Sequence, residues 1–402
     1  MSIFRIFARI PRGVMTLLWA QMASQMGDAA FSVLLLWAVL ESTDSKLVIG
    51  LVAMLNYLPI LLFGMVGGLA ADRLPRRGLM IASDAVRACL CLALPLAGWS
   101  GLMNPWILAA AGFGLFTASA FFNPARDAYI PSLVTETELV KANALIQTSV
   151  PIGWLFGPAL CAAFLKWVPA VHLFAGVGAL FLVSVFFLLG LKRSPVAERH
   201  AVPPGLEELF SGLKTSWGDV RLRWLLVITA ADNLFIMGPA IVGTPLLVKN
   251  ILGGSGPSYA LMEALLALGV FAGLPFTLWL NRHVGQGKAL IAGIFLDGIT
   301  YLPLLWVTSM WGAGATVALH GVSIPLITVT RTSLVQRIAP SHQLGRIFAL
   351  INITVLGFTA ISSGLTGLAA TMVPVNVIFG VIAVAAALCG PAAWMSRKFR
   401  EA

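Results

Sequence analysis

Charged side chains are scarce in this chain. Asp, Glu, Lys and Arg make up 10% of its 402 residues, whereas a soluble globular domain carries about 25%. Hydrophobic residues make up 59%, and the mean hydropathy is +0.92. This balance excludes a water-soluble globular protein. It predicts a polytopic membrane protein, in which each helical crossing takes about 20 mostly apolar residues.

Cysteine is also rare. The four cysteines all lie within apolar stretches, and their spacing fits neither a disulfide framework nor a metal site. The sequence contains no H-E-x-x-H, G-x-S-x-G or P-loop motif. We therefore expect no enzyme activity, no cofactor and no bound metal.

Apolar stretches long enough to cross a bilayer alternate with short polar turns. The connection 192–223 is the one long exception, and its apolar residues recur at helical spacing from Leu206 to Trp217, which predicts an amphipathic helix on the inner membrane face. Residues Met1–Arg12 predict a short interfacial helix for the same reason. The sequence thus predicts an all-α membrane protein with twelve transmembrane helices, at 14–40, 47–71, 78–99, 104–125, 140–165, 168–191, 224–248, 257–280, 288–308, 310–330, 345–370 and 373–395.

Lys and Arg are distributed unevenly over the connections. With a cytoplasmic N-terminus, 22 of the 26 Lys and Arg residues lie in inner segments, and only Lys46, Lys166 and Lys249 lie in outer ones. The positive-inside rule therefore predicts that both termini lie in the cytoplasm, and the expected location is a plasma membrane, here a bacterial inner membrane. The same asymmetry explains the net charge of +10, because anionic headgroups attract the inner residues. The expected partners of these charges are membrane lipids and not nucleic acid.

An internal repeat relates the two halves of the chain. A shift of 205 positions places Arg126 on Arg331 and Asp28 on Asn233, within a longer run of matches. This offset predicts two six-helix bundles, 1–191 and 224–402, joined by the linker 192–223. Parallel repeats of this kind are related by a pseudo-two-fold axis, with a cavity between them.

The loop between the second and third predicted spans carries a motif. It reads Gly68-Leu-Ala-Ala-Asp72-Arg73-Leu-Pro-Arg76-Arg77 and is similar to the G-x-x-x-D-R-x-G-R-R signature of the major facilitator superfamily. We expect Gly68 to allow a close approach of two helices. The resemblance implies the major facilitator fold and a conformational latch, formed by Gly68, Asp72, Arg73, Arg76 and Arg77.

The fifth predicted span carries a second motif. Gly153-x-x-x-Gly157-Pro158 resembles a signature of antiporters in the same superfamily. The residues around Asn123 to Asp127 are similar to the drug:proton antiporter branch, which contains macrolide and siderophore exporters. Packing of a proline-kinked helix on small residues explains the glycines equally well, so both interpretations stay open.

Polar residues inside the spans require an explanation, because an ionisable side chain costs at least about 2.5 to 3.5 kcal/mol at a helix centre. Gln21, Gln25 and Asp28 form one stripe along the first span and are expected to face a water-filled cavity. Asp28 is the predicted site of competition between substrate and proton; a structural acid is the alternative. Further cavity candidates are Asp232, Asn233, Gln147, Asn143, Asn352 and Glu263. The alternatives are a gate or hinge in the seventh span, snorkelling of Glu263 to the outer interface, and polar contacts between helices for the other three.

Other buried ionisable residues have a structural interpretation. Asp84 and Arg87 are three residues apart and predict an intrahelical ion pair. Asp297 stands alone in its span and ranks low for transport, because that span is peripheral in the superfamily. The histidines, including His320, are expected in loops or at interfaces.

These observations predict a secondary active transporter that works as a monomer. It would export a small amphipathic molecule, such as a drug or siderophore, in exchange for protons by alternating access. A lysophospholipid or other lipid-like substrate is an alternative on the same fold. A non-transporting sensor or scaffold is the alternative from another class, since a fold alone does not determine a function.

Overall fold

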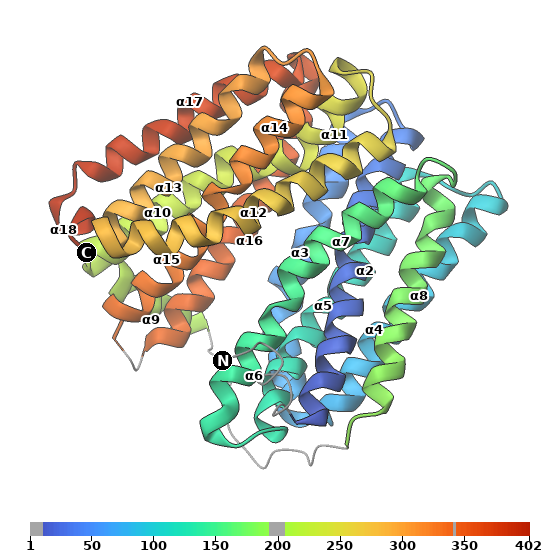
Figure 1. The fold of residues 1–402 in the computed structure, drawn as a ribbon, viewed down its shortest axis with the longest axis horizontal. Helices are drawn as coiled ribbons and strands as arrows, with labels where there is room; N and C mark the ends of the chain where they lie inside the picture. The colour runs from blue at the N-terminus through green and yellow to red at the C-terminus, as the bar shows by residue number, and fades with distance from the viewer. Residues whose placement is uncertain (1–10, 193–205, 341–342) are drawn as a thin grey trace. The chain divides into compact units, whose positions relative to one another are not determined.

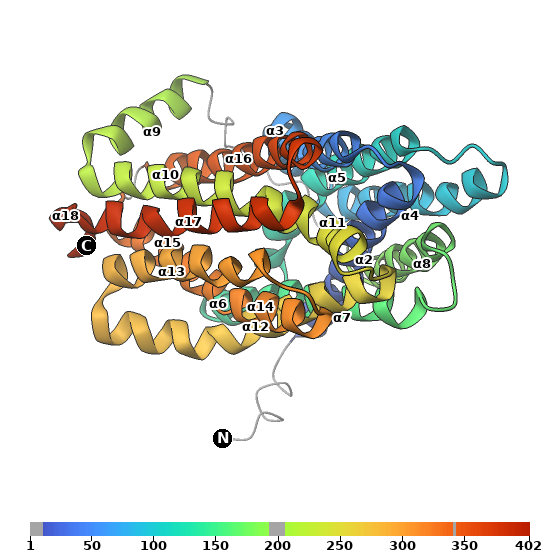
Figure 2. The ribbon, with the colours of Figure 1, turned by 90° about the horizontal axis from the view of Figure 1, so that it is seen from above.

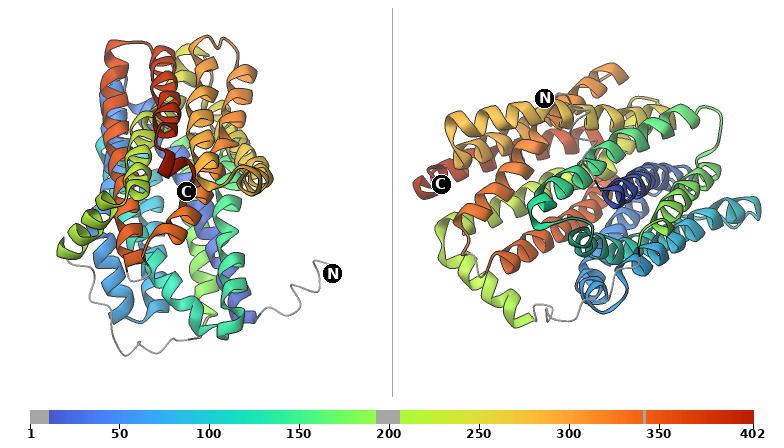
Figure 3. Two further views of the ribbon diagram at one scale, coloured as in Figure 1. Left: turned by 90° about the vertical axis from the view of Figure 1, so that its left-hand side faces the viewer. Right: turned by 60° about the horizontal axis from the view of Figure 1, so that its bottom comes forward.

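The computed structural model describes residues 11–192, 206–340 and 343–402, and within these ranges every regular element is a helix (Figure 3). The interfacial helix expected at Met1–Arg12 lies almost entirely outside the described residues. Within the described ranges, twelve helical segments are long and apolar enough to cross a membrane, which confirms the predicted number.

Several crossings extend beyond the apolar stretches that predicted them. The fourth spans Pro105–Ser132 and the tenth spans Met310–Ile338, so Arg126 and Arg331 lie within helices and not in loops. A helix satisfies its own backbone hydrogen bonds, so it can continue past the point where its side chains become polar.

The chain divides into two compact units, and two helices pass from one unit to the other. Unit 1 contains residues 1–38 and 59–203, and unit 2 contains 39–58 and 204–402. The end of α2 (Arg12–Ser42) and the first half of α3 (Lys46–Arg73) therefore pack with unit 2. The remaining helices of unit 1 are α4 (Arg76–Trp99), α5 (Pro105–Tyr129), α6 (Glu136–Gln147), α7 (Ser149–Phe164) and α8 (Ala170–Leu189).

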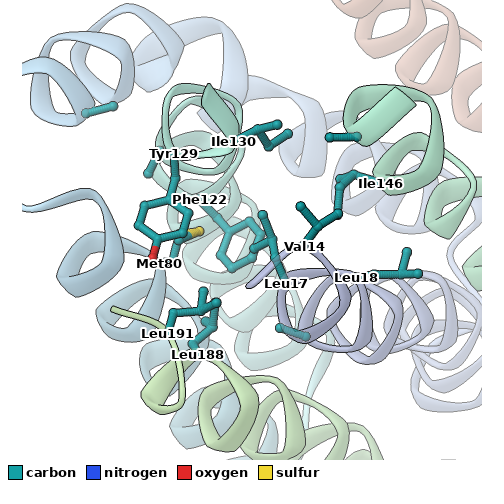
Figure 4. Packing of buried hydrophobic residues seen from close by; sticks show 14 residues of the cluster. Val14, Leu17, Leu18, Met80, Phe122, Tyr129, Ile130, Ile146, Leu188 and Leu191 are labelled. Carbon is teal, nitrogen blue, oxygen red and sulfur yellow. The ribbon is translucent and has the colours of Figure 1, made fainter. Parts of the chain in front are cut away.

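In unit 1, α4 packs along both α5 and α8 (Figure 1). A buried apolar cluster joins the start of α2 to these helices, with Val14 and Leu17 against Phe122 and Tyr129 (Figure 4). The hydroxyl of Tyr129 donates to the carbonyl oxygen of Lys192 at 2.7 Å, which satisfies its one polar atom. Such packing holds the helices together in lipid, where the hydrophobic effect between helices is absent.

In unit 2, the helices α10, α17 and α13 run side by side (Figure 2). The seventh crossing changes from α-helical to π-helical turns at Asn233. The helices of this unit are α9 (Leu206–Gly218), α10 (Val220–Asp232), η2 (Asn233–Met237), η3 (Pro239–Gly243), α11 (Thr244–Leu246), η4 (Leu247–Ile251), α12 (Gly256–Val284), α13 (Gln286–Tyr301), η5 (Leu302–Leu305), α14 (Met310–Gly321), α15 (Ser323–Ile338), α16 (Leu344–Met372), α17 (Val375–Trp394) and α18 (Arg397–Arg400).

The start of the seventh crossing is fixed by an N-cap. The Asp219 carboxylate accepts hydrogen bonds from the backbone N–H and the guanidinium group of Arg221, both at 2.7 Å. These hydrogen bonds favour the charged carboxylate and lower the pKa of Asp219. The cap satisfies a backbone donor of the first turn where the helix leaves the linker.

The close helix approach predicted at Gly68 is found one residue earlier. A Cβ atom at Gly67 would lie 2.0 Å from the carbonyl oxygen of Ala120 on α5, whereas a Cβ atom at Gly68 would meet no atom within 4 Å. The prediction for Gly68 was wrong on this point, because adjacent residues of a helix point in directions about 100° apart. Gly67 faces α5 and Gly68 does not.

We expect Gly67→Ala to destabilise the protein and Gly68→Ala to leave it unchanged. The methyl group at position 67 would meet backbone atoms that cannot rotate away, at a cost of about 1 to 3 kcal/mol or more. Thermal unfolding of the two purified variants in the same detergent tests this. A loss of melting temperature in Gly68→Ala equal to that in Gly67→Ala would contradict the assignment.

Candidate functional site

A buried network of charges in unit 1 joins α2 to α4. The Nη1 atom of Arg87 lies 3.1 Å from Asp84 Oδ1 and 3.5 Å from Asp28 Oδ1. Ser24 bridges the two helices, because its hydroxyl donates to Asp84 Oδ1 at 3.2 Å and accepts from Arg87 at 3.0 Å. The intrahelical pair of Asp84 and Arg87 is therefore present as predicted, but it also includes the proposed coupling residue Asp28.

The three charged side chains of this network differ in exposure. The side chains of Arg87 and Asp84 are 1% and 0% exposed, while that of Asp28 is 19% exposed. The guanidinium carbon of Arg87 also lies 4.9 Å from the ring centroid of Phe122 and 5.4 Å from that of Phe181. Aromatic faces stabilise a cation that water does not reach. Asp28 is thus the member of the network that a proton or a ligand can reach.

The network carries one cation and two carboxyl groups. With both acids ionised its charge is −1, and one bound proton makes it neutral. Arg126, the other cation whose charge reaches Asp28, is already paired with Asp127 at 2.7 Å. Because an unpaired buried charge is costly, a bound proton or a second cationic group would stabilise the network.

The rest of the predicted stripe on α2 is buried. Gln21 is 0% exposed and Gln25 is 8% exposed. The side-chain amide of Gln21 makes no hydrogen bond with the residues that the structure describes. It therefore keeps its full hydrogen-bonding capacity on the same helix as Asp28.

The glycine motif of the fifth crossing packs against α2 beside the network. A Cβ atom at Gly153 would lie 2.6 Å from Gln25 Cβ, and one at Gly157 would lie 2.8 Å from the carbonyl oxygen of Met26. These two glycines of α7 therefore allow the backbones to approach at the level of Asp28. Pro158 follows on the same helix and is buried. This geometry fits the packing interpretation and also positions the candidate coupling residue.

The polar residues of the seventh crossing occupy a different environment, inside unit 2. Asn233 donates to the carbonyl oxygen of Thr229 at 2.8 Å and accepts from Thr359 of α16 at 3.3 Å. One helical turn after Thr359 on α16, the hydroxyl of Ser362 accepts from the backbone N–H of Gly238 and donates to the carbonyl oxygen of Leu234. The Ser362 side chain thus inserts between backbone groups of the seventh crossing. The π-helical turns lie at the same place, as expected where a side chain interrupts the backbone hydrogen bonds of a helix.

Asp232 and Asp297 are both buried in unit 2, at 7% and 3% exposure. His320 is 2% exposed, and its Nε2 atom lies 3.7 Å from Asp297 Oδ1. His320 therefore lies buried within α14 and not in a loop, and the low rank of Asp297 for transport stays a prediction. Sequence reasoning missed the contact of Asp297 with His320 because the two residues lie on different helices, α13 and α14.

The other cavity candidates lie at the surface of their units. Asn143, Gln147 and Asn352 are exposed, and Glu263 is partly buried. Among the residues that the structure describes, no hydrogen bond joins these side chains to the Arg87 network or to Asp297. Their part in a substrate cavity stays a prediction.

The four charged residues of the predicted latch divide into two pairs. Arg76 donates to the carbonyl oxygen of Ala128 at 2.8 Å, and Arg77 donates to those of Leu188 and Leu189 at 3.0 and 2.6 Å. They place positive charge at the ends of α5 and α8, where helix dipoles favour it. The other two, Asp72 and Arg73, make no hydrogen bond or ion pair with described residues. Their role as a latch stays a prediction.

Comparison with known proteins assigns the family. The model of the Major Facilitator Superfamily matches residues 17–358, so the chain belongs to this superfamily of secondary transporters, which are not enzymes. Macrolide efflux protein A of Streptococcus pyogenes is 25% identical over 339 residues, which cover 83% of each chain. Multidrug efflux pump Tap of Mycolicibacterium fortuitum is 23% identical, over 88% of this chain and 87% of that one.

Solved structures confirm the fold. The nucleoside transporter NupG matches with a TM-score of 0.80 at 10% identity, over 96% of this chain and 98% of that one. A POT family transporter in complex with 5-aminolevulinic acid matches with a TM-score of 0.78 at 12% identity, over 96% of both chains. At these identities the structures establish the major facilitator fold and leave the substrate open.

We expect Arg87→Met to destabilise the protein by about 3 to 5 kcal/mol, because it leaves two buried acids without their cation. Adding Asp84→Asn should restore part of this loss by removing one carboxylate. Thermal unfolding in detergent measures both changes. As a control, Arg397→Met removes an exposed ion pair with Glu401 and should cost less than about 1 kcal/mol. Equal effects of the two arginine variants would rule out the network as a buried structural unit.

Proposed function

We propose that the protein exports a small amphipathic molecule across the bacterial inner membrane in exchange for protons. The proposal depends above all on one observation: Asp28 is partly exposed and lies 3.5 Å from a fully buried arginine. The named functions of the efflux relatives support the direction of transport. In this proposal both termini lie in the cytoplasm and a single chain is the working unit.

The charge of the Arg87 network explains how substrate and proton would compete. A proton on Asp28 makes the network neutral, which a site of low dielectric constant favours. A basic amine on the substrate would do the same by pairing with the ionised carboxylate. Substrate binding therefore requires proton release, and proton binding expels the substrate. Both ligands act at one carboxyl group, so the exchange needs no separate coupling pathway.

Alternating access requires contacts that form in one state and break in the other. The outer end of the α2–α3 hairpin supplies candidates within unit 2. Lys46 donates to the carbonyl oxygen of Ala370 at 2.8 Å, and Lys249 donates to that of Leu40 at 2.6 Å. Each lysine thus binds the carboxyl-terminal end of another helix, where a cation is favourable. We propose that these contacts close the outer side and that they open during each cycle.

We expect Asp28→Asn to fold and to lose proton-driven efflux by at least tenfold. Asp84 still pairs with Arg87 in this variant, so the buried cation keeps a partner. Everted membrane vesicles with an imposed proton gradient, and with erythromycin and ethidium as separate probes, measure the rate. Glu401→Gln, which removes an exposed acid that pairs with Arg397, is the control and should retain the rate. Unimpaired efflux by Asp28→Asn would exclude this residue from coupling.

A cross-link across the proposed outer contact should stop transport. A Cβ atom at Gly364 of α16 would lie 3.2 Å from the sulfur of Met54 on α3, so Met54→Cys and Gly364→Cys together place two thiols within reach. In a background without the four native cysteines, an oxidant should abolish efflux and a reductant should restore it. Each single variant is the control. Full transport by the cross-linked protein would show that this contact does not open.

A further inference from the structure

Ser323, at the start of α15, has one hydroxyl hydrogen and two neighbours that accept hydrogen bonds. Its Oγ atom lies within hydrogen-bonding distance of Asp297 Oδ1 on α13, and 2.6 Å from the carbonyl oxygen of His320 on α14. A backbone carbonyl and an ionised carboxylate accept hydrogen bonds and donate none. If Asp297 were ionised, one of the two contacts would therefore join two oxygen atoms with no hydrogen between them.

A proton on Asp297 removes this conflict. The carboxyl group then donates to the Ser323 hydroxyl, and that hydroxyl donates to the carbonyl oxygen of His320, so each contact has its own hydrogen. Water cannot easily supply the missing hydrogen in the ionised form, because Asp297 is 3% exposed and Ser323 is 2% exposed. Buried polar groups without hydrogen bonds are costly. The geometry therefore favours a neutral carboxylic acid.

The imidazole ring of His320 fits the same assignment. Its Nδ1 atom lies 3.2 Å from the carbonyl oxygen of Asp297 and 3.1 Å from the hydroxyl of Thr300. The Thr300 hydroxyl donates to the carbonyl oxygen of Leu296 at 2.7 Å, so the hydrogen in both contacts belongs to Nδ1. A neutral ring then has its lone pair on Nε2, which lies 3.7 Å from Asp297 Oδ1. This lone pair would repel an ionised carboxylate.

Close packing encloses the two side chains. The ring of Tyr301 stacks on that of His320, with a centroid distance of 3.8 Å and an interplanar angle of 13°. A Cβ atom at Gly298, the residue after Asp297, would lie 2.3 Å from the backbone nitrogen of Ala387 on α17. The backbones of α13 and α17 are thus in direct contact beside the carboxyl group, which helps to keep it from solvent.

The surrounding helices offer Asp297 no paired cation. In the part of the chain that the structure describes, no Lys or Arg forms an ion pair with it. Arg331 is eight residues after Ser323, about two helical turns along α15. The titratable and charged side chains that interact electrostatically around this cluster are Asp232 on α10, Glu263 on α12, Tyr301 on α13, Arg331 on α15 and Cys389 on α17. An ionised Asp297 would be a buried charge without a cationic partner, which is costly.

We propose that Asp297 is a proton-binding site, in which a neutral carboxylic acid is held between α13, α14 and α15. Ser323 and His320 are positioning residues in this site. Folding takes up the proton, because an aspartic acid in the unfolded chain loses it above about pH 4. Stability therefore falls as the pH rises above this value. The contacts involve neither Asp28 nor a substrate, so the bound proton does not depend on the proposed function.

Infrared spectroscopy tests the protonation of Asp297. The carbonyl stretch of protonated carboxyl groups, identified by its shift in D2O, is compared at neutral pH between the wild type and Asp297→Asn. The variant should lack one carboxyl group, calibrated against a carboxylic acid standard. Bands of equal size in the two proteins would overturn the proposal. Glu401→Gln removes an exposed acid and is the control, which should leave the band unchanged.

Nitrogen NMR of the wild type with 15N-labelled histidine gives a second measurement, which does not require the Asp297 variant to fold. The contact of the His320 ring with Tyr301 assigns its signals. We expect a hydrogen on Nδ1 and none on Nε2 at neutral pH. Hydrogens on both nitrogens would overturn the proposal, because the proton would then belong to an imidazolium paired with an ionised Asp297.

The pH dependence of stability tests the uptake of the proton on folding. Asp297→Asn should fold, because its side chain is neutral and keeps an amide donor for Ser323. Unfolding by SDS in mixed micelles, from about pH 5 to pH 8, gives the folding equilibrium constant of each protein. Relative to the variant, the wild-type constant should fall by about tenfold per pH unit. The same pH dependence in both proteins would show that no proton is taken up at Asp297.

Discussion

The pairing of a buried arginine governs the chemistry of unit 1. Arg87 cannot lose its charge under any physiological condition, and its guanidinium lies where water does not reach it. Two acids, a bridging serine and two aromatic rings therefore surround it. One acid would suffice to neutralise the arginine. The second acid gives the network a net negative charge, which a bound proton or cation would neutralise.

Helix packing explains why the network lies where it does. Gly153 and Gly157 bring α7 against α2, which closes one side of the helix that carries Asp28. On the other side, Ser24 and Asp84 bind α2 to α4. The coupling candidate thus sits on a helix that is held on both faces. A carboxyl group positioned in this way can respond to a ligand with a change of charge and little change of place, which is the preorganisation that a selective site requires.

The number of crossings and the superfamily could be predicted from the sequence, because apolar length and local motifs carry that information. The role of Asp28 stays a prediction. The partners of Asp28 could not. Arg87 and Asp84 are nearly sixty residues away and were recognised only as neighbours of each other. The same limit applies to the close helix approach, which was predicted at Gly68 and found at Gly67. Adjacent residues lie on different faces of a helix, and the motif does not show which face packs against a neighbour. Asp297 and His320 looked unremarkable for the same reason: only the packing of α13 against α14 brings them together.

The two units carry different residues at positions that the predicted repeat aligns. The shift that relates the halves places Asp28 on Asn233, while the acid of the seventh crossing is Asp232. One residue along a helix turns a side chain by about 100°, so Asp232 and Asn233 point in different directions, and Asn233 contacts α16. Unit 1 places two acids around a fully buried arginine, whereas the buried Asp297 of unit 2 lies beside a histidine, His320. In the proposed mechanism the first arrangement accepts either a proton or a substrate cation, because its two acids exceed its one cation.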